Sequence, residues 1–253
     1  VMNYDAFMEP VTWFLTGMEK HSDDYREDLL GNSESFWGAM RHHTSSFSMP
    51  SWQVAMNELS NHDHSRFLTR TNHKVGRTNT LGPQAAEQGI NKAVFREGVV
   101  IQMTWTGAPT IYYGDEAGVC GFTDPDNRRT YPWGHEDQVL LAFHKDIIRL
   151  RRENEELRSG SLKMLESDYN FISYGRFNRK GQCAVLINNN NHPITKEIHV
   201  WEIGTPKTGK MKVILQSRDD GYCMEGAEYE IKAGKILIEM PQTSATILKF
   251  IEE

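Results

Sequence analysis

The sequence contains few cysteines, and their positions support no cysteine chemistry. Cys120, Cys183 and Cys223 are far apart, odd in number and without the spacing of metal ligands. They favour a reducing compartment, which points to the cytoplasm. A signal peptide is also absent, but the chain opens with Val1-Met2-Asn3-Tyr4, a pattern typical of the inside of a strand. If the true N-terminus is missing, the absence of a signal peptide is uninformative and the location stays unknown.

The chain also lacks long apolar runs and an excess of basic residues. No run approaches the roughly 20 apolar residues of a membrane span. Lysine and arginine number 28 against 34 aspartates and glutamates, so the net charge is −6. No basic face offsets this charge, which argues against nucleic acid as the main partner. We therefore expect neither a membrane nor a nucleic-acid partner.

What is present in residues 1–157 is an alternation of strand and helix patterns. Residues 1–4 predict the end of a buried strand, and two further strands are expected at Trp52–Leu59 and Pro109–Tyr113. The 3.6-residue period predicts the helices, which are Ala6 to Gly17, Ser33 (with Ser35 at the cap) to near Pro50, Pro83 to Gly107, and His135 to Arg152.

From Gly160 onward the hydrophobic period changes from 3.6 to 2. Residues 158–253 therefore predict a separate antiparallel β-sandwich. Its expected strands are 162–165, 170–177, 183–188, 198–201, 211–215, 228–231, 236–240 and 246–250. The predicted fold class is α/β plus all-β, with about three β/α units of a TIM barrel followed by the sandwich.

Three strand–helix units cannot close a barrel, because eight units need about 250 residues for themselves. Two strand edges would be left bare, and bare edges pair with other chains. We expect one of two explanations. Either the chain is a C-terminal fragment whose N-terminal barrel half is missing, or it forms a homo-oligomer through its open edges.

Polar residues follow the predicted strands. Asn61, His62 and Asp63 come after the second strand, the third ends in Tyr113–Glu116, and a loop with charged residues follows. Because the carboxyl ends of barrel strands lie on one face, these groups are expected to share a cleft. Carboxylates, an imidazole, an arginine and tyrosine rings suit a neutral, polyhydroxylated ligand such as a sugar.

Each of these signals also has a structural interpretation. A His-Asp pair at a strand end more often satisfies nearby backbone groups. Glu116 can cap the turn that follows it. Arg128 and Arg129 can form ion pairs with Asp124 or Asp126.

In combination, three phrases of the sequence resemble the α-amylase family, glycoside hydrolase family 13. They are Asn61-His62-Asp63, Gly107 to Glu116, and Asp124-Pro125-Asp126-Asn127-Arg128-Arg129. The last phrase is similar to the neopullulanase, cyclomaltodextrinase and maltogenic amylase group. The resemblance implies that residues 1–4, 54–59 and 109–113 are the sixth, seventh and eighth barrel strands. It also implies that the residues from about 160 onward form the family's C-terminal β-sandwich.

The resemblance assigns roles by position. Asp63 matches the third catalytic carboxylate, which holds the 2- and 3-hydroxyls of the sugar in the −1 subsite. His62 matches the imidazole that binds the same sugar, and Asn61 belongs to the same motif as a substrate-binding residue. Asp124 and Arg128 match a pair that binds sugar units further toward the non-reducing end.

The resemblance also implies what this chain does not contain. The family's nucleophilic Asp and acid/base Glu lie on the fourth and fifth strands, before Val1. Retaining hydrolysis needs two carboxyl groups about 5–5.5 Å apart. The parent protein is expected to hydrolyse α-1,4 glucosidic bonds in starch-like oligosaccharides or cyclodextrins, and α-1,6 bonds are a further candidate. The chain alone is expected to be inactive. No cofactor is expected, and calcium, common in the wider family, would have its ligands in the absent part.

Two other classes of function stay open. One is a non-catalytic carbohydrate-binding or self-assembling module, which would bind maltooligosaccharide at about millimolar level or worse because much of the pocket wall is absent. The other is a metal-dependent phosphohydrolase that uses His62 and Asp63. That chemistry needs further converging ligands, and His64 and His73 lack ligand spacing, so we expect no metal site.

Overall fold

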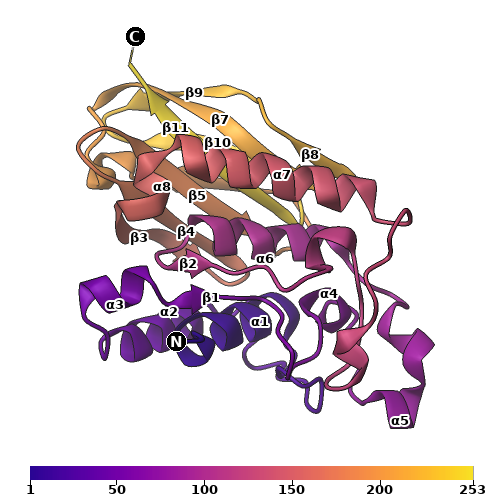
Figure 1. The fold of residues 1–253 in the computed structure, drawn as a ribbon. Coiled ribbons are helices and arrows are strands. Elements are labelled where there is room, and N and C mark those ends of the chain that lie inside the picture. The colour runs from indigo at the N-terminus through magenta and orange to yellow at the C-terminus, as the bar shows by residue number, and fades with distance from the viewer. Residues whose placement is uncertain (253) are drawn as a thin grey trace.

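The computed structural model describes residues 1–252. Its first part folds into helices around a short parallel sheet, and its second part is an antiparallel sandwich that lies above the helices in Figure 1. The helices and the two strands of the first part are η1 (Tyr4–Met8, a π-helix), α1 (Glu9–Thr16), α2 (Ser33–Thr44), α3 (Met49–Gln53), β1 (Met56–Asn57), α4 (Phe67–Arg70), α5 (Thr78–Leu81), η2 (Pro83–Ala86), α6 (Lys92–Thr104), β2 (Ala108–Pro109), η3 (Asp115–Ala117), η4 (Asp126–Arg128), α7 (Gln138–Glu153) and α8 (Glu155–Ser159).

Three strand positions of the first part lie side by side and run parallel. Met2 bridges to Met56, and β1 pairs in parallel with β2. Because helices connect these positions, they form successive strand–helix units of the barrel type. This arrangement confirms the predicted fold class.

The strands themselves are shorter than the predicted Trp52–Leu59 and Pro109–Tyr113. Pro50 lies in the first turn of α3, where its fixed φ favours a helix start, so residues 49–53 are helical. Val54 follows that helix and is 68% exposed. Ladder pairing is confined to Met56–Asn57 and Ala108–Pro109, and the apolar residues beyond pack without forming strand.

One helix cap and one helix start differ from the prediction, and an asparagine explains each; α2 begins at Ser33 as predicted but ends at Thr44, not near Pro50. The side chain of Asn32, not Ser33, caps α2 by accepting the N–H of Ser35 at 2.9 Å. The long helix begins at Lys92 and not at Pro83, because the Asn91 side chain accepts the first free N–H groups of α6. The segment that begins at Pro83 is only the short 3₁₀-helix η2, and α6 ends at Thr104, before Gly107.

The second part contains nine strands within the described residues. They are β3 (Ser161–Asp168), β4 (Phe171–Phe177), β5 (Gln182–Asn188), β6 (Ile194–Ile198), β7 (Thr208–Arg218), β8 (Gly221–Cys223), β9 (Glu228–Lys232), β10 (Ile236–Met240) and β11 (Ser244–Ile251). The larger sheet has the order β3-β4-β5-β11-β7-β8 with β9 also on β7, and β6 pairs with β10 in a separate sheet. The predicted strand 198–201 is wrong, because the chain after Ile198 forms the 3₁₀-helix η5 (Val200–Ile203).

Alternation along the strands gives the larger sheet two buried faces. In β5, Cys183, Val185 and Ile187 belong to the core shared with the helices. Ala184 and Leu186 belong to the core shared with β6 and β10. Because successive side chains point to opposite faces, β5 contributes to both cores and is buried along nearly its whole length.

The helical part and the larger sheet share one continuous hydrophobic core. The Thr104 and Tyr174 hydroxyls lie 2.6 Å apart, and the rings of Trp105 and Tyr174 make an edge contact at 5.0 Å. Buried Arg176 donates to the carbonyls of Thr104 and Gly160. The division between residues 157 and 158 stays a prediction. No helix among the described residues is long and apolar enough to cross a membrane.

Candidate active site

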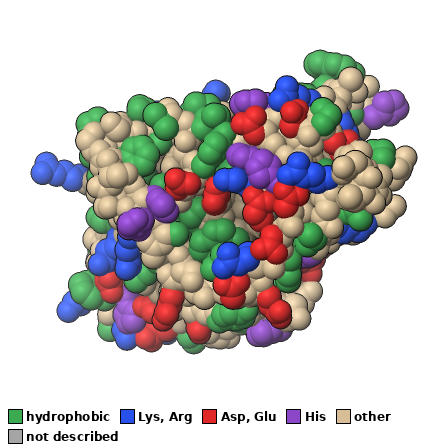
Figure 2. Space-filling view, turned by 90° about the horizontal axis from the view of Figure 1, so that it is seen from below, with side chains coloured by type: hydrophobic (Ala, Val, Ile, Leu, Met, Phe, Trp, Pro, Cys, Tyr) green, Lys and Arg blue, Asp and Glu red, His purple; other side chains and the backbone are tan. Residues whose placement is uncertain are grey.

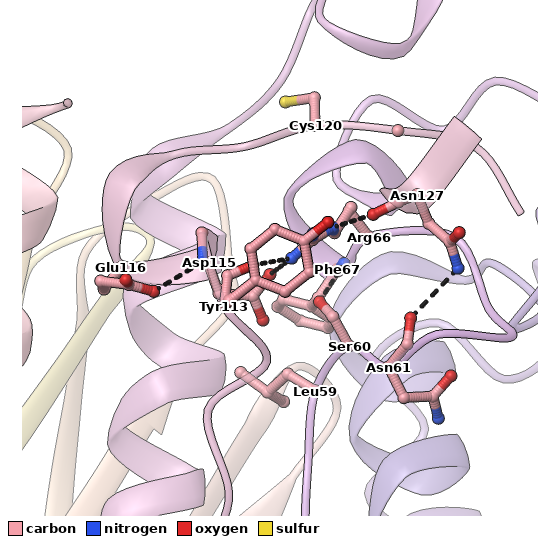
Figure 3. Close-up of polar contacts among 12 residues, drawn as sticks. Leu59, Ser60, Asn61, Arg66, Phe67, Tyr113, Asp115, Glu116, Cys120 and Asn127 are labelled. Atoms are coloured by element: carbon pink, nitrogen blue, oxygen red, sulfur yellow. Dashed lines mark hydrogen bonds and ion pairs between the residues drawn. The ribbon is translucent and has the colours of Figure 1, made fainter. Parts of the chain in front are cut away.

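The loop after β1 is organised by the side chain of Asn61. Its Oδ1 accepts the N–H groups of Asp63 at 2.9 Å and His64 at 3.0 Å, and its Nδ2 donates to Glu58 at 3.2 Å. An asparagine side chain that bonds the backbone two residues on fixes a local turn. Asn61 is only 2% exposed, and the side chain of Asn127 donates to its carbonyl (Figure 3). The buried side chain of Asn61 therefore fixes the backbone of this loop, and its contact with substrate stays a prediction.

Asp63 and His62 are the groups that this loop presents to solvent. Their side chains are 47% and 53% exposed, and His62 Nε2 lies 3.3 Å from Asp63 Oδ1. The backbone of Asp63 is held by the Thr123 hydroxyl, which donates to its carbonyl at 2.6 Å. The carboxylate and the imidazole are therefore adjacent, accessible and fixed through the main chain.

Asp124 and Arg128 lie beside this pair. Arg128 Nε is 2.8 Å from Asp124 Oδ1 and also donates to the carbonyl of His62 at 3.1 Å. Arg129 pairs with Asp126, so both ion pairs expected for this loop are confirmed. A cavity of about 560 Å³ adjoins them and is lined by Arg77, Thr78, Asn79, Thr123, Asp124, Pro125, Asp126, Arg128 and Arg129.

Buried Arg66 ties the loop after β1 to two segments that follow β2, as Figure 3 shows. Its Nη1 donates to the Tyr113 carbonyl at 2.7 Å and to Asp115 at 3.0 Å, and its Nε donates to the Asn127 carbonyl at 2.8 Å. The guanidinium also lies 4.1 Å from the centre of the Tyr112 ring. This residue was not predicted, because its partners come from loops far away in the sequence.

The expectation that Tyr113–Glu116 projects into the cleft is wrong for its two carboxylates. Asp115 is buried against Arg66, and burial raises the pKa of its carboxyl despite that neighbour. Glu116 accepts the N–H of Gly114 at 2.9 Å, so it caps the turn as its structural interpretation held. Both carboxylates support the loop instead of facing a ligand.

Two residues near Asp63 were missed by the sequence reasoning. Burial, and then the carboxylates of Glu58 and Asp63, raise the pKa of Tyr4 to about 12. Burial is also the main reason that the pKa of Glu58 is raised. Tyr4 directly follows the first strand position, so the rule that found Asp63 could have found it. Glu58 gave no signal, because a single acidic residue inside an apolar run is ordinary.

His64 is buried beneath the loop that carries His62 and Asp63, and it is not accessible to a ligand. Its ring makes edge contacts with Tyr4 at 4.9 Å and His21 at 4.7 Å. Burial first, and then the charge of Arg70, lower the pKa of His64 to about 3. The imidazole therefore remains neutral over the physiological range.

The electrostatic character of the surface is mixed. In the view of Figure 2, acidic, basic and histidine side chains are interspersed with apolar ones, and no broad field of one sign is visible. Among residues 1–252, no three His, Cys, Asp or Glu side chains converge on a point that could hold a metal ion.

Fold and site together define a class of protein. Parallel strand–helix units that deliver an imidazole and carboxylates at the strand ends, followed by a β-sandwich, are part of a (β/α)-barrel enzyme with a C-terminal β domain. Comparison with known families agrees. Residues 18–146 match the α-amylase catalytic domain, and residues 163–251 match the α-amylase C-terminal all-β domain. The chain belongs to the α-amylase family, glycoside hydrolase family 13.

Curated relatives are glycoside hydrolases of the same family. An amylopullulanase of Thermoanaerobacter thermohydrosulfuricus is 31% identical over 205 residues, covering 80% of this chain and 14% of the relative. Neopullulanase 2 of Thermoactinomyces vulgaris is 30% identical over 252 residues, covering 98% of this chain and 36% of the relative. The match therefore spans 14% of the length of the amylopullulanase and 36% of the length of neopullulanase 2.

A solved structure supports the fold. The debranching enzyme of Nostoc punctiforme in its native form superposes with a TM-score of 0.75 at 22% identity. The likeness covers 98% of this chain and 47% of that enzyme. At this identity the comparison concerns the fold alone.

Proposed function

We propose that this chain supplies one wall of the active site of a retaining α-glucan hydrolase. The observation that carries the proposal is the accessible Asp63–His62 pair in the loop after β1, with the Asp124–Arg128 ion pair directly beside it. The family membership and the names of the relatives, which include amylopullulanase and neopullulanase, support the same substrate class.

In this proposal Asp63 orients the sugar at the bond to be cleaved. An ionised carboxylate only accepts hydrogen bonds, so two adjacent sugar hydroxyls can donate to its two oxygens. Bonds of this kind strengthen as the ring distorts toward an oxocarbenium-like transition state, and they contribute several kcal/mol in glycosidases. His62, 3.3 Å away, binds the same sugar and limits where it sits.

Asp124 and Arg128 bind sugar units further from the cleaved bond. Their side chains are each 48% exposed while paired to one another, so each retains free hydrogen-bonding capacity toward the cavity. A carboxylate and a guanidinium together accept from and donate to the hydroxyls of one sugar.

The wall formed by this chain does not complete the chemistry. Retaining hydrolysis uses a nucleophilic carboxylate and an acid/base carboxyl about 5–5.5 Å apart. Asp63 cannot perform both roles, and Asp115 and Glu116 are engaged in the loop. We infer that the nucleophile and the acid come from the N-terminal half of the barrel and that the chain alone is inactive.

The test compares this chain with a joined protein, defined as the chain preceded in one polypeptide by the N-terminal half of the barrel. Release of reducing sugar from starch and from cyclodextrin is measured for both. We expect turnover by the joined protein and none by the chain alone. Turnover by the chain alone would contradict the proposal.

A second candidate is a non-catalytic carbohydrate-binding or self-assembling module. The exposed strand position at Met2 (39% exposed) favours self-assembly, because an unpaired strand edge can pair with another copy. Sedimentation of the chain tests this, and a stable monomer would count against it. Calorimetry with maltoheptaose separates a binding module from a chain that binds no glucan.

A further inference from the structure

Two consecutive hydrogen bonds lie behind the backbone of Asp63. The Thr123 hydroxyl donates to the Asp63 carbonyl at 2.6 Å, and Nδ1 of His21 lies 2.8 Å from the same hydroxyl oxygen. The three residues come from three loops, which follow α1, β1 and η3. Thr123 is almost fully buried, and His21 is half-buried. The two bonds therefore join segments that are far apart in the sequence.

The direction of both hydrogen bonds follows from the number of protons available. A threonine hydroxyl has one hydrogen and two lone pairs, and a backbone carbonyl can only accept. The single hydrogen of Thr123 therefore points to Asp63, and its oxygen must accept from His21. A neutral His21 ring with its only proton on Nε2 would place two lone pairs against each other at 2.8 Å. His21 therefore carries a proton on Nδ1.

The loop that carries His21 is held in place by other contacts. The Glu19 carboxylate accepts the N–H of His21 at 2.7 Å. The N–H of Ser65, in the loop after β1, donates to the Lys20 carbonyl at 3.1 Å. On its other side the imidazole makes an edge contact with the buried ring of His64 at 4.7 Å. The imidazole therefore has little freedom to turn away from the hydroxyl.

We propose that His21 is a positioning residue for Asp63 and acts through Thr123. The inference rests on the proposed function, in which the carboxylate of Asp63 contacts the sugar. The His21 donor directs the hydroxyl hydrogen toward the Asp63 carbonyl, and consecutive hydrogen bonds strengthen one another. The main chain of Asp63 is thereby held in one position while its contacts with the sugar strengthen in the transition state.

Thr123 also sets the position of Asp63 relative to the neighbouring ion pair. It directly precedes Asp124, whose N–H donates to the same Asp63 carbonyl at 3.5 Å. Asp124 in turn pairs with Arg128, which donates to the His62 carbonyl. A displacement of about 1 Å in a catalytic site can lower a rate about a hundredfold. Loss of the hydroxyl is therefore expected to slow the reaction without removing any group that contacts the sugar.

The experiment measures maltoheptaose hydrolysis by the joined protein and by variants that keep or remove one hydrogen-bonding group. His21→Leu removes the ring nitrogen, whereas His21→Asn keeps a donor at the δ position. Thr123→Val removes the hydroxyl, and Thr123→Ser keeps it. We expect His21→Leu and Thr123→Val to lower kcat about tenfold or more and to change KM less than about twofold. His21→Asn and Thr123→Ser should retain kcat within about threefold.

A double variant tests whether His21 acts through Thr123. Once Thr123→Val has removed the hydroxyl, His21→Leu has nothing further to remove, so the double variant should have the kcat of Thr123→Val alone. The control is His192→Leu, which should leave kcat unchanged because His192 is exposed beside Asn191. Urea midpoints of all variants separate lost stability from lost positioning.

Nitrogen-15 NMR of the chain supplies a readout that does not depend on activity. The neutral ring of His21 should carry its proton on Nδ1 in the original chain and in Thr123→Ser. In Thr123→Val this tautomer should lose its preference, because the acceptor is gone. A neutral ring with its proton on Nε2 in the original chain would overturn the proposal.

The kinetic outcomes separate this role from the proposed function. If the joined protein hydrolyses maltoheptaose and His21→Leu leaves kcat unchanged, the positioning role is overturned and the proposed function stands. Losses that multiply in the double variant would also overturn it, because the two side chains would then act independently. So would a loss in His21→Asn as large as in His21→Leu. If the joined protein hydrolyses no glucan, the proposed function fails and the role of His21 fails with it.

Discussion

At the scale of single residues, buried side chains hold the backbone of the loops that carry Asp63 and His62. The amide oxygen of Asn61 accepts two N–H groups of the loop backbone, and the guanidinium of Arg66 donates to two carbonyls and one carboxylate. Asp63 and His62 stay accessible because these buried neighbours hold the main chain beneath them. Removing a buried partner of a charged pair typically costs about 3–5 kcal/mol, so such residues affect the site through stability.

His64 gives a testable pH dependence. Its pKa is lowered to about 3, below the ordinary 6.5 of histidine, so the unfolded chain takes up a proton at a pH where the folded chain does not. The free energy of unfolding therefore falls as the pH drops below 6.5, by about 2 kcal/mol from this residue at pH 5. Burial also lowers the pKa of His144, which acts in the same direction.

We expect His64→Gln to flatten this dependence. Urea unfolding at pH 7, 6 and 5 should show a smaller loss of stability in the variant than in the original chain, whatever its stability at pH 7. His192→Gln is the control, since His192 is exposed beside Asn191. An unchanged slope in His64→Gln would show that His64 is protonated in the folded protein as readily as in the unfolded chain.

At the scale of elements, packing decides where a helix can accept a larger side chain. Gly98 lies within α6, and a Cβ added there would come within 2.6 Å of the Phe67 ring. Gly38 lies within α2, and a Cβ there would meet nothing within 4 Å. The two glycines have the same intrinsic helix propensity and opposite surroundings.

Alanine substitutions should therefore have opposite effects. Gly98→Ala is expected to destabilise the chain by about 1–3 kcal/mol through overpacking. Gly38→Ala is expected to stabilise it by about 0.5–1 kcal/mol through reduced backbone entropy. Denaturant midpoints measure both. Stabilisation by both substitutions would mean that α6 and α4 are not in contact at Phe67.

The elements also show how far the sequence alone could lead. Periodicity identified the four longest α-helices and most sandwich strands, because burial of one face imposes a period of 3.6 or 2, and it missed the short helices α3, α4, α5 and α8. It placed the start of α6 at Pro83 because proline favours a first turn, whereas Asn91 provides the actual cap. It made the barrel strands too long, because apolar residues such as Leu59 are buried without pairing.

The candidate site could be predicted in part for a similar reason. Asp63, His62, Asp124 and Arg128 were found because they follow strands or share one short motif, and the structure brings them together. Arg66 could not be found, since it acts through carbonyls contributed by residues 61 and 47 positions away.

At the scale of the whole molecule, the sandwich covers the helices of the barrel part. One hydrophobic cluster runs from Phe7 in η1 to Ile247 in β11, with Trp105 and Tyr174 where the two parts meet. In the view of Figure 1, α6 and α7 lie on the side of the short parallel strands that faces the larger sheet, and α1 and α2 lie below those strands. A shared core of this kind supports the barrel part from one side, and we propose that the other wall of the cleft comes from the N-terminal half of the barrel.

The central claim is that Asp63 completes a glucan hydrolase site whose other carboxylates lie in the N-terminal half of the barrel. The most direct measurement is starch hydrolysis by the joined protein and by its Asp63→Asn variant, with Asp168→Asn as the control on the exposed β3 terminus. We predict that Asp63→Asn lowers kcat at least about a hundredfold, because the lost contacts strengthen in the transition state. Asp168→Asn should leave kcat unchanged. Full activity in Asp63→Asn would contradict the account.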